Sequence, residues 1–370
     1  MGFLDVVFYA FTVVVFIQVI FYIFFFGKFA FLKPIKKRQN NIDISVIICS
    51  KNEAENLMHF LPSIISQDYP NFEIVLINDA SHDDTLEVME AFSAKHSNIK
   101  IVDVKNTEAF WGNKKYALTL GIKASKYDYL LFTDADCKPV SKYWIKEMSS
   151  HFDNEKSIVL GYGAYSKIKK SLLNKLIRFE TLSTAIHYFS FANQGLPYMG
   201  VGRNLAYTKD EFFKANGFIS HIKVRSGDDD LFINQIASKT NTAICFSNES
   251  FTESVPETIF KDWFNQKRRH ISTAKYYKSK HKSLLALIYI TNLLFWLFAF
   301  ILLISLHYWP IVLAFFLIKI IFQYAIIGAS AKKLNEKDLL FLIPFLEIFL
   351  IGFQLAIFIN NLFSKPNHWK

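Results

Sequence analysis

The sequence predicts an α/β domain with a mixed, mostly parallel sheet, flanked on both sides by helical transmembrane segments. The first observation is composition: of 370 residues, 52% are hydrophobic, 39 are Phe and 20% are charged, whereas a soluble globular chain carries about 25% charged residues. The second is distribution, because long apolar runs stand near both ends and short strand-like runs alternate with helical patterns between them. These features exclude disordered, collagen-like and coiled-coil chains.

The N-terminal apolar run predicts a transmembrane helix within residues 1–30. Residues 3–26 are almost all apolar, and a span needs about 20 such residues. A cleaved signal peptide starts with basic residues, whereas MGFLD contains none. The basic residues follow the run, at Lys33, Lys36, Lys37 and Arg38. The positive-inside rule then predicts an N-terminus outside the cell and a cytoplasmic chain from residue 33 onward.

Residues 42–282 predict a cytoplasmic α/β domain. The apolar runs IDISVIIC, FEIVLIND, NIKIVDV and YDYLLFTDAD each end in polar residues, and helical stretches separate them. Such alternation indicates βαβ units and a largely parallel sheet. Ligands of these sheets bind at the carboxyl ends of the strands, where the polar clusters of this chain lie.

Residues 284–363 return to membrane composition and predict about three further helices. The candidate spans are residues 284–306, 311–329 and 339–363. Lys332 and Lys333, after the second of them, suit a cytoplasmic loop, so we expect both chain termini outside. Glu347 and Gln354 are the two polar residues that we identify inside these runs. Polar groups are costly in lipid unless paired, so we expect helix–helix hydrogen bonds there ahead of contact with a lipid-linked acceptor.

Charge and cysteine content narrow the function classes. The net charge is +10, and the basic clusters flank apolar runs, which favours a cytoplasmic-side charge bias over nucleic-acid binding. Cys49, Cys137 and Cys245 are odd in number and far apart. This spacing argues against a disulfide scaffold or a zinc site and fits a reducing compartment.

An acidic pair at the end of a predicted buried strand is the strongest candidate site. Asp134 and Asp136 follow the apolar run Tyr129–Phe132. Two carboxylates two residues apart can present oxygen ligands to one Mg²⁺ or Mn²⁺, which would bridge the phosphates of a nucleotide. A solvated turn is the alternative for such a pair, and the buried strand before it favours the metal.

Two further strand ends and one helix start carry polar residues. Asp79 can accept an N–H from a nucleotide base, and Ser81 and Asp83 are expected to cap the helix that follows. Glu53, after the first strand, is either a nucleotide contact or an acid that meets a helix dipole. Lys114, which follows Asn113, either meets an anionic phosphate or belongs to a solvated pair of lysines.

Seven short motifs occur in an order that is typical of one enzyme family. They are SVIICSKNE, INDASHDDT, GNKKYAL, FTDADC, GVGRNLAY, SGDDDL and QKRRH, over roughly residues 42–272. In this order they resemble the membrane-bound family 2 glycosyltransferases, which include cellulose, chitin, hyaluronan and poly-N-acetylglucosamine synthases. The resemblance implies a GT-A-type fold that binds a nucleotide sugar. It also implies that the nucleotide-sugar ligands are Ser50, Glu53, Asp79, Lys114 and Asp134.

The resemblance also implies the metal ligands and the catalytic base. Asp134 and Asp136 match the family's metal-binding pair. Asp228 and Asp229 match a Glu-Asp pair whose second member is the general base, so we favour Asp229 as base with Asp228 in support. This chain departs from the pattern by having Asp in place of Glu and by a third acid, Asp230, which we expect in the first turn of a helix.

The acceptor and diphosphate side follows from two other motifs. Gln266, Arg269 and His270 match the family's QxxRW, with His in place of Trp, so stacking of an aromatic ring on the acceptor is not implied. The family's acceptor side matches Gly202, Arg203 and Asn204, for which a turn is the alternative.

The residue chemistry points to glycosyl transfer. Transfer to an alcohol with inversion needs one base for the acceptor proton and positive charge for the departing diphosphate; Asp229, the metal-bound pair and Arg269 would supply them. A hydrolase needs two carboxyl groups that flank the scissile glycosidic bond. The motifs that are expected to bind the nucleotide would then have no function.

We therefore expect an inverting glycosyltransferase at the cytoplasmic face of the cell membrane. Its donor would be a nucleotide-diphosphate sugar, with uridine as the expected nucleoside, and its acceptor a glycan or a lipid-linked molecule. One alternative is a polyprenyl-phosphate glycosyltransferase. The other, from a different class, is a transporter with a cytoplasmic regulatory domain, which the small number of polar residues in the apolar runs disfavours.

Overall fold

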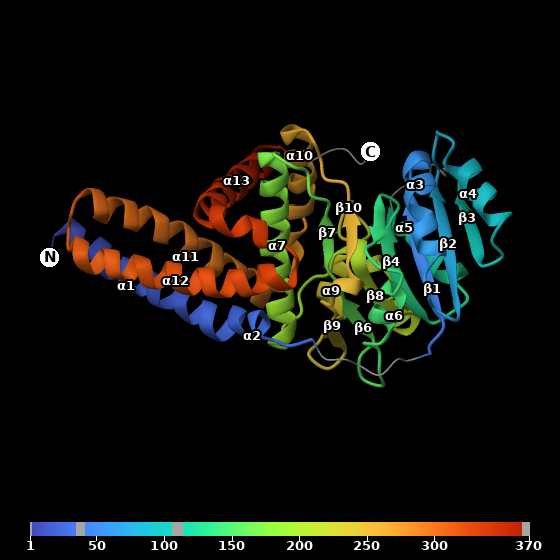
Figure 1. The fold of residues 1–370 in the computed structure, drawn as a ribbon, viewed down its shortest axis with the longest axis horizontal. Helices are drawn as coiled ribbons and strands as arrows, with labels where there is room; N and C mark the ends of the chain where they lie inside the picture. Colours follow the sequence, from blue (N-terminus) through green and yellow to red (C-terminus); the bar gives the residue numbers. More distant parts are fainter. Residues whose placement is uncertain (1, 35–40, 106–113, 365–370) are drawn as a thin grey trace.

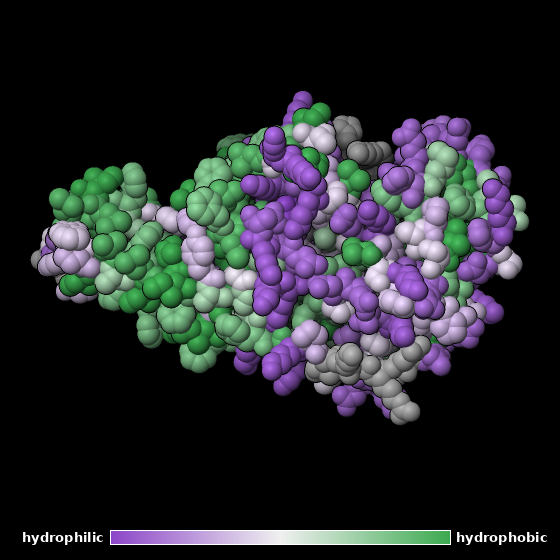
Figure 2. All heavy atoms as spheres, viewed as in Figure 1, coloured by the Kyte–Doolittle hydropathy of each residue, from purple (hydrophilic) through white to green (hydrophobic). Residues whose placement is uncertain are grey.

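The computed structural model describes residues 2–34, 41–105 and 114–364; the basic residues Lys36, Lys37 and Arg38 lie outside these ranges. An α/β domain forms one end of the molecule, and long helices extend from it (Figure 1). The surface of these helices is hydrophobic, whereas hydrophilic residues cover the domain and the belt where the helices meet it (Figure 2).

A seven-stranded sheet forms the centre of the domain, in the order β3-β2-β1-β4-β8-β6-β9. The strands are β1 (Ile44–Ser50), β2 (Phe72–Asp79), β3 (Ile99–Val104), β4 (Tyr129–Asp134), β6 (Ile158–Leu160), β8 (Leu205–Thr208) and β9 (Thr242–Ile244). The first four are parallel, β8 is antiparallel to both of its neighbours, and β6 pairs with β9 in parallel. The predicted mixed, mostly parallel sheet is confirmed.

Helices cover both faces of this sheet, which explains why its central strands are continuous apolar runs. One face carries α3 (Ala54–Ile65), α4 (Thr85–Ser93) and α6 (Trp144–Ser149), and the other α5 (Lys114–Ala124) and α7 (Leu172–Asn193). Along β1, Val46 and Ile48 pack in the core on the face covered by α3, and Ile47 packs in the core on the face covered by α5. This alternation follows from the two-residue period of a strand.

A three-stranded sheet lies beside the first, in the order β5-β10-β7. Its strands are β5 (Cys137–Pro139), β7 (Gly163–Tyr165) and β10 (Thr252–Ser254). The short helices α8 (Lys209–Lys214) and α9 (Asp230–Ile236) and the longer α10 (Phe260–Ile271) complete the domain. Because β5 follows β4 after two residues, the small sheet places α10 beside the carboxyl ends of the large one.

Four helical segments are long and apolar enough to cross a membrane, as expected. The first runs through α1 (Phe3–Ile20), a π-helical turn (Phe21–Phe26) and α2 (Gly27–Ala30), and the others are α11 (Ser279–Ile304), α12 (Trp309–Lys333) and α13 (Ile343–Phe363), the last preceded by the 3₁₀ helix η6 (Lys337–Leu342). Together with the domain between them, these segments follow the expected order along the chain.

The expectation of two polar residues in the apolar runs is wrong, because Lys319 and Gln323 also lie inside α12. Glu347 of α13 accepts hydrogen bonds from Lys319 Nζ and from Trp296 Nε1, both at 2.9 Å, and Lys319 Nζ also donates to Gln323 Oε1 at 2.9 Å. The expected helix–helix hydrogen bonds of Glu347 are confirmed. Pairing of this kind is what makes ionisable side chains tolerable at membrane depth.

Candidate active site

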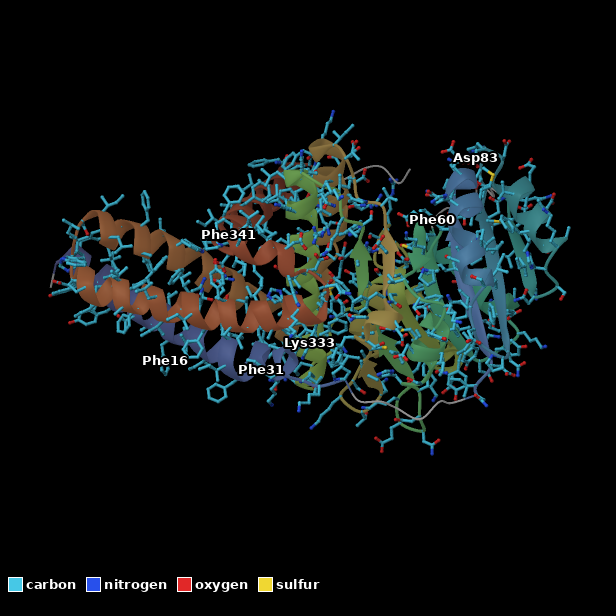
Figure 3. The ribbon with its side chains drawn as sticks, viewed as in Figure 1. Phe16, Phe31, Phe60, Asp83, Lys333 and Phe341 are labelled. Atoms are coloured by element: carbon cyan, nitrogen blue, oxygen red, sulfur yellow. The ribbon has the colours of Figure 1, made fainter. Side chains whose placement is uncertain are left out.

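The carboxyl ends of β1, β2 and β4 lie at one edge of the large sheet. In the register, Ser50 pairs with Asn78 and Cys49 with Asp134, so the three strands end at nearly the same level. Parallel strands therefore bring the predicted nucleotide-side and metal-side residues to this edge. Asp83, in the loop after β2, marks it in Figure 3.

Hydrogen bonds join the loop after β1 to the loop after β2. Asn52 N donates to Ser81 Oγ at 3.0 Å, and Ala54 N donates to Asp83 Oδ2 at 3.2 Å. Asp83 precedes Asp84, the N-cap residue of α4, and accepts a hydrogen bond from Thr85 N at 3.1 Å, so it binds the first residue of α4 as well as that of α3. We expected Ser81 to cap the helix that follows it. Its hydroxyl instead accepts the hydrogen bond from the loop after β1.

The nucleotide-side candidates differ in exposure. Ser50 is 1% exposed, and Asp79 is 8% exposed. Burial raises the pKa of Asp79, against the effect of Lys51 and Lys114. Glu53 stands at the start of α3, where Asn56 Nδ2 donates to its Oε2 at 2.5 Å. Of these residues Ser50 lies beneath the edge, while Asp79 and Glu53 border it.

Lys114 joins the strand-end acids to the acidic motif after Gly227. Its Nζ lies 2.8 Å from Asp134 Oδ1 and 3.3 Å from Asp228 Oδ2. Burial opposes its charge, but these two carboxylates hold the pKa of Lys114 well above its ordinary value. The alternative of a solvated lysine pair is thus excluded for Lys114. Asn113 lies outside the described residues.

Lys115 is a structural residue that sequence reasoning missed. It is fully buried on α5, and its Nζ donates to the carbonyls of His221, Val224 and Ser226 at 2.9, 2.7 and 2.8 Å. These bonds fix the loop that leads into Asp228. The only signal in the sequence was its place beside Lys114, which did not reveal a partner more than 100 residues away.

Gly227 makes the turn that presents the acidic motif. Its φ is +94°, and a Cβ atom there would lie 2.6 Å from Leu231 Cδ1. Residues other than glycine rarely adopt this backbone conformation. The turn allows three consecutive aspartates to point to three different partners.

The three aspartates have separate environments. Asp228 faces Lys114, as described. Asp229 accepts hydrogen bonds from Gly202 N and from Asp230 N, both at 2.7 Å. Asp230 begins α9, as expected, and accepts hydrogen bonds from Thr273 Oγ1 and from Tyr277 Oη, the latter at 2.6 Å. Asp230 therefore ties α9 to the segment after α10.

The pKa values of the first two aspartates are shifted in opposite directions. Burial is the main cause that raises the pKa of Asp229 to about 7, and the carboxylates of Asp228 and Asp230 add to it. Burial acts in the same sense on Asp228, but Lys114 holds the pKa of Asp228 below its ordinary value. A base works best when its pKa lies near the working pH, which Asp229 satisfies.

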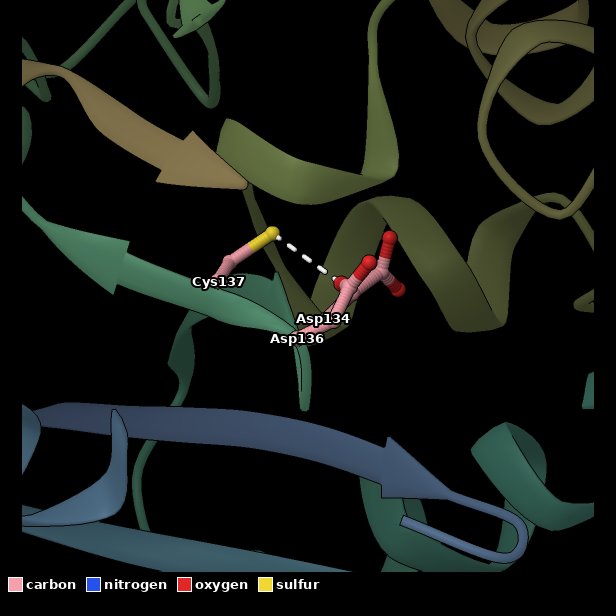
Figure 4. Close-up of side chains that lie close together, drawn as sticks. All are labelled: Asp134, Asp136 and Cys137. Carbon is pink, nitrogen blue, oxygen red and sulfur yellow. Dashed lines mark hydrogen bonds between the residues drawn. The ribbon is translucent and has the colours of Figure 1, made fainter. Parts of the chain in front are cut away.

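Asp134 and Asp136 fit a divalent cation. Their carboxylate oxygens and Cys137 Sγ lie within 4.8 Å of one another (Figure 4). Burial and the neighbouring Asp134 raise the pKa of Asp136, so a cation would relieve an unfavourable pair of like charges. Burial keeps the pKa of Cys137 well above its ordinary value. The two carboxylates supply oxygen donors, which suit Mg²⁺ or Mn²⁺.

The turn Gly202–Asn204 braces the site. Arg203 donates to Gly163 O and Ser254 Oγ, both at 3.0 Å, and lies 4.2 Å from the centre of the Tyr165 ring. Because all of these partners belong to the small sheet, we correct the expected acceptor contact of Arg203 to a role in holding that sheet.

Asn204 needs the same correction. It is 0% exposed, accepts from Trp144 Nε1 at 3.0 Å, and donates to Tyr162 O at 2.9 Å and to Ser250 O at 2.7 Å. An acceptor cannot reach this side chain without breaking those bonds. Gly202, whose N–H binds Asp229, keeps its place at the site.

The QxxRH motif lies on α10, which passes the site on the membrane side. Burial lowers the pKa of Arg269, and among the charges that oppose this shift the carboxylates of Asp228 and Asp134 act most strongly. His270 is exposed, whereas Lys267 and Trp263, one and two turns earlier along α10, are buried. The helix thus turns Arg269 toward the acids and its apolar face toward its neighbours.

A cavity of about 400 Å³ opens beside the site, between α3 and the small sheet. Its walls include Asn56, His59 and Phe60 on α3 and Lys138 and Ser254 on the small sheet; Phe60 is labelled in Figure 3. Ser254 Oγ lies 3.0 Å from Cys137 Sγ, so the cavity adjoins the acidic pair. Sequence reasoning missed this space because its walls come from four segments that are far apart in the chain.

Two family models match the chain. The model described as glycosyl transferase family 2 matches residues 45–213, and the one described as glycosyl transferase family group 2 matches residues 135–329.

Similar proteins carry related names. A poly-beta-1,6-N-acetyl-D-glucosamine synthase of Staphylococcus epidermidis is 35% identical over 118 residues, which are 31% of this chain and 27% of that protein. The glycosyltransferase AglE of Haloferax volcanii is 32% identical over 105 residues, which are 28% of this chain and 33% of that protein. The matched stretch thus spans a third or less of the length of these curated relatives.

One solved structure shares the fold over most of its length. It is the mannosyltransferase PcManGT from Pyrobaculum calidifontis, in complex with GDP-Man and Mn²⁺. The TM-score is 0.58 at 17% identity, over 90% of this chain and 99% of that one. The predicted GT-A-type fold with candidate membrane helices is confirmed.

Proposed function

Because the chain belongs to the family 2 group of glycosyltransferases, we propose that it transfers a sugar, with inversion, from a nucleotide-diphosphate sugar to a hydroxyl group of a glycan or a lipid-linked acceptor. The observation that carries this proposal is the arrangement of the acids. Lys114 bridges Asp134 and Asp228, while Asp229 stands next to Gly202 with a raised pKa.

Each part of the site has a task in the proposed reaction. Asp134 and Asp136 would hold a divalent cation, Mg²⁺ or Mn²⁺, which supplies positive charge to the diphosphate. Arg269 stabilises the same diphosphate as it leaves. Asp229 takes the proton of the acceptor hydroxyl while the acceptor oxygen bonds to the anomeric carbon and the bond to the diphosphate breaks. Asp79 and Glu53 orient the nucleoside at the strand ends.

A hydroxyl acceptor is favoured over a lipid phosphate by the environment of Asp229. A phosphate oxygen is already ionised at neutral pH and needs no base, whereas a hydroxyl needs one. A carboxylate with a pKa of about 7 suits the second task. The transporter alternative gains no support, because Lys319 of α12 and Glu347 of α13 pair with each other.

A donor screen tests the proposed activity. We expect the detergent-solubilised protein to release a nucleoside diphosphate from one donor class, with UDP-sugars and GDP-mannose as the first probes, and to do so faster when an acceptor is added. Release that is equally fast without an acceptor would indicate a hydrolase. No release from any donor would contradict the proposal.

The proposed site faces the cytoplasm, because the basic residues near the membrane gather at the domain ends of the helices. Lys28, Lys332 and Lys333 lie near the domain, whereas the turn at Ser305 lies at the far end, where His307 binds Asp5 at 3.0 Å. The positive-inside rule then predicts a cytoplasmic domain.

Cysteine labelling tests this orientation. On intact cells, an impermeant maleimide is expected to label Ser305→Cys and to leave Lys332→Cys unlabelled until the membrane is permeabilised. Both positions are exposed; Ser305 lies shortly before α12 and Lys332 lies in its last turn. The reverse pattern would place the domain outside the cell.

A further inference from the structure

The segment after α12, residues 334–364, starts at the end of the membrane helices that lies next to the α/β domain. Arg178 of α7 binds Glu336 through Nε at 2.9 Å and Asp338 through Nη1 at 2.9 Å. Lys167 Nζ binds Asp338 Oδ1, also at 2.9 Å. The side chains of Arg178 and Glu336 are 3% and 2% exposed. They form a buried salt bridge between the catalytic domain and the segment.

The same segment also ends at the domain side. Arg268 of α10 donates through Nε to Asn361 Oδ1 at 3.0 Å and through Nη2 to Ser364 O at 2.8 Å. In return, Asn361 Nδ2 donates to Arg268 O at 3.2 Å. The last turn of α13 is therefore bound to a helix of the catalytic domain by bonds in both directions.

Between these two ends the segment reaches membrane depth. Glu347, early in α13, binds Lys319, which lies about 14 residues, or about 21 Å of helix, before the domain-side end of α12 at Lys333. The hydrocarbon core of a bilayer is about 30 Å thick. In Figure 1, α1, α11 and α12 extend side by side away from the domain, while α13 stays next to α7 and α10.

We propose that residues 334–364 form a re-entrant element that enters the membrane and returns to the side of the catalytic domain, and that its returning end holds α10 in position. Of the four candidate spans in the described residues, α1, α11 and α12 then cross the membrane. This differs from the expectation of a fourth crossing with the C-terminus outside. Length and hydropathy alone cannot separate the two cases, because both give an apolar helix of the same size.

The second half of the proposal concerns Arg269 and rests on the proposed function. Trp263 of α10 is fully buried and stacks on Phe353 of α13, with ring centres 4.2 Å apart and planes 12° apart. Asn361 binds the carbonyl of Arg268, the residue that precedes Arg269. Arg268 and Asn361 are thus positioning residues, which act on the diphosphate through Arg269. A misplacement of about 1 Å can cost about 100-fold in rate.

Labelling of Ser364→Cys tests the path of the chain. We expect it to behave like Lys332→Cys and unlike Ser305→Cys towards the impermeant maleimide on intact cells. Labelling together with Ser305→Cys would show that α13 crosses the membrane and would overturn the proposal. This comparison needs no activity and holds for either orientation of the domain, so it is independent of the proposed function.

Kinetics of Asn361→Ala test the positioning role. We expect kcat for nucleoside diphosphate release to fall about tenfold, with a smaller change in donor KM, and Asn361→Asp, which keeps the acceptor for Arg268, to recover part of the loss. Asn360→Ala is the matched control: this exposed neighbour donates its amide to its own helix, at Ala356 O, and its variant should match the wild type.

A double variant separates positioning from a general loss of stability. Because Asn361 acts through Arg269, the variant Arg269→Ala/Asn361→Ala should be no slower than Arg269→Ala alone. Additive losses, or an Asn361→Ala variant as fast as Asn360→Ala, would overturn the positioning role while leaving the proposed function intact. An inactive wild type would instead contradict the proposed function.

Discussion

Asp136→Asn is expected to lower the rate of nucleoside diphosphate release by a factor on the order of 100 to 1,000. The side chain stands just after β4, outside the sheet cores, so the fold should survive the change. With one carboxylate of the pair removed, a divalent cation loses a charged ligand and the departing diphosphate is poorly neutralised. We expect the same loss in the wild type with excess chelator, reversed by added Mn²⁺ or Mg²⁺.

The control for this prediction is Asp210→Asn. Asp210 is 67% exposed and pairs with Lys214 within α8, so its variant should keep full activity. An Asp136→Asn protein as active as this control, or a wild type indifferent to chelator, would contradict the metal site. Measurement of the unfolding temperature of both variants would separate a catalytic loss from a loss of fold.

Asp229→Asn is expected to lower kcat by a factor on the order of 100 to 10,000 while leaving binding of the nucleotide sugar nearly unchanged. The reason is that the proposed base acts on the acceptor and not on the donor. Gly202 N and Asp230 N bind the two different oxygens of Asp229, so the single amide oxygen of Asn can accept only one of these hydrogen bonds, and it cannot take a proton. Titration calorimetry with UDP and single-turnover kinetics would measure the two effects separately.

The pH profile gives an independent check on Asp229. A base must be deprotonated to act, so kcat/KM of the wild type should fall as the pH drops below about 7, the pKa that burial and neighbouring acids give this residue. Asp228→Asn removes one of those acids, so the fall should move to lower pH. An unchanged profile in Asp228→Asn would assign the titration to another group.

Single variants of the neighbouring aspartates test which of the three residues is the catalytic base. Asp230→Asn should reduce mainly the unfolding temperature, because Asp230 binds Thr273 and Tyr277 away from the sugar. If Asp228→Asn is inactive and Asp229→Asn is not, the base lies one position earlier than proposed. If all three variants remain active, base catalysis by this motif is wrong, and the lipid-phosphate acceptor becomes the better explanation.

Local patterns in the sequence were sufficient for the fold and for part of the site. Alternating apolar runs and helical patterns predicted the parallel strands, and the acids predicted at their ends lie together because parallel strands share one carboxyl edge. The positions of Asp79 and Asp134 at the ends of β2 and β4 needed no other information, and their roles remain proposals. The helix start at Asp230 was likewise predictable, since an acid in a first turn is favoured by the helix dipole.

Other roles depend on partners far away in the chain, and no local pattern contains them. Lys115 donates hydrogen bonds to carbonyls of the loop before Gly227. Arg203 and Asn204 hold the small sheet instead of facing an acceptor. Lys319 is visible inside its apolar run, but its pairing with Glu347, which lies on another helix, is not. In each case a polar group is buried, and the packing of distant segments determines which group satisfies it.

Periodicity, composition and short motifs were enough to predict the α/β domain, the membrane helices, the metal-binding pair as a candidate and the family resemblance. The folded structure was needed to assign one aspartate to Lys114 and another to Gly202, since one turn at Gly227 directs three adjacent side chains apart. It also decided that both ends of the segment 334–364 contact the domain. Hydropathy measures how apolar a helix is, whereas its direction depends on the ionic and aromatic contacts that bind its two ends.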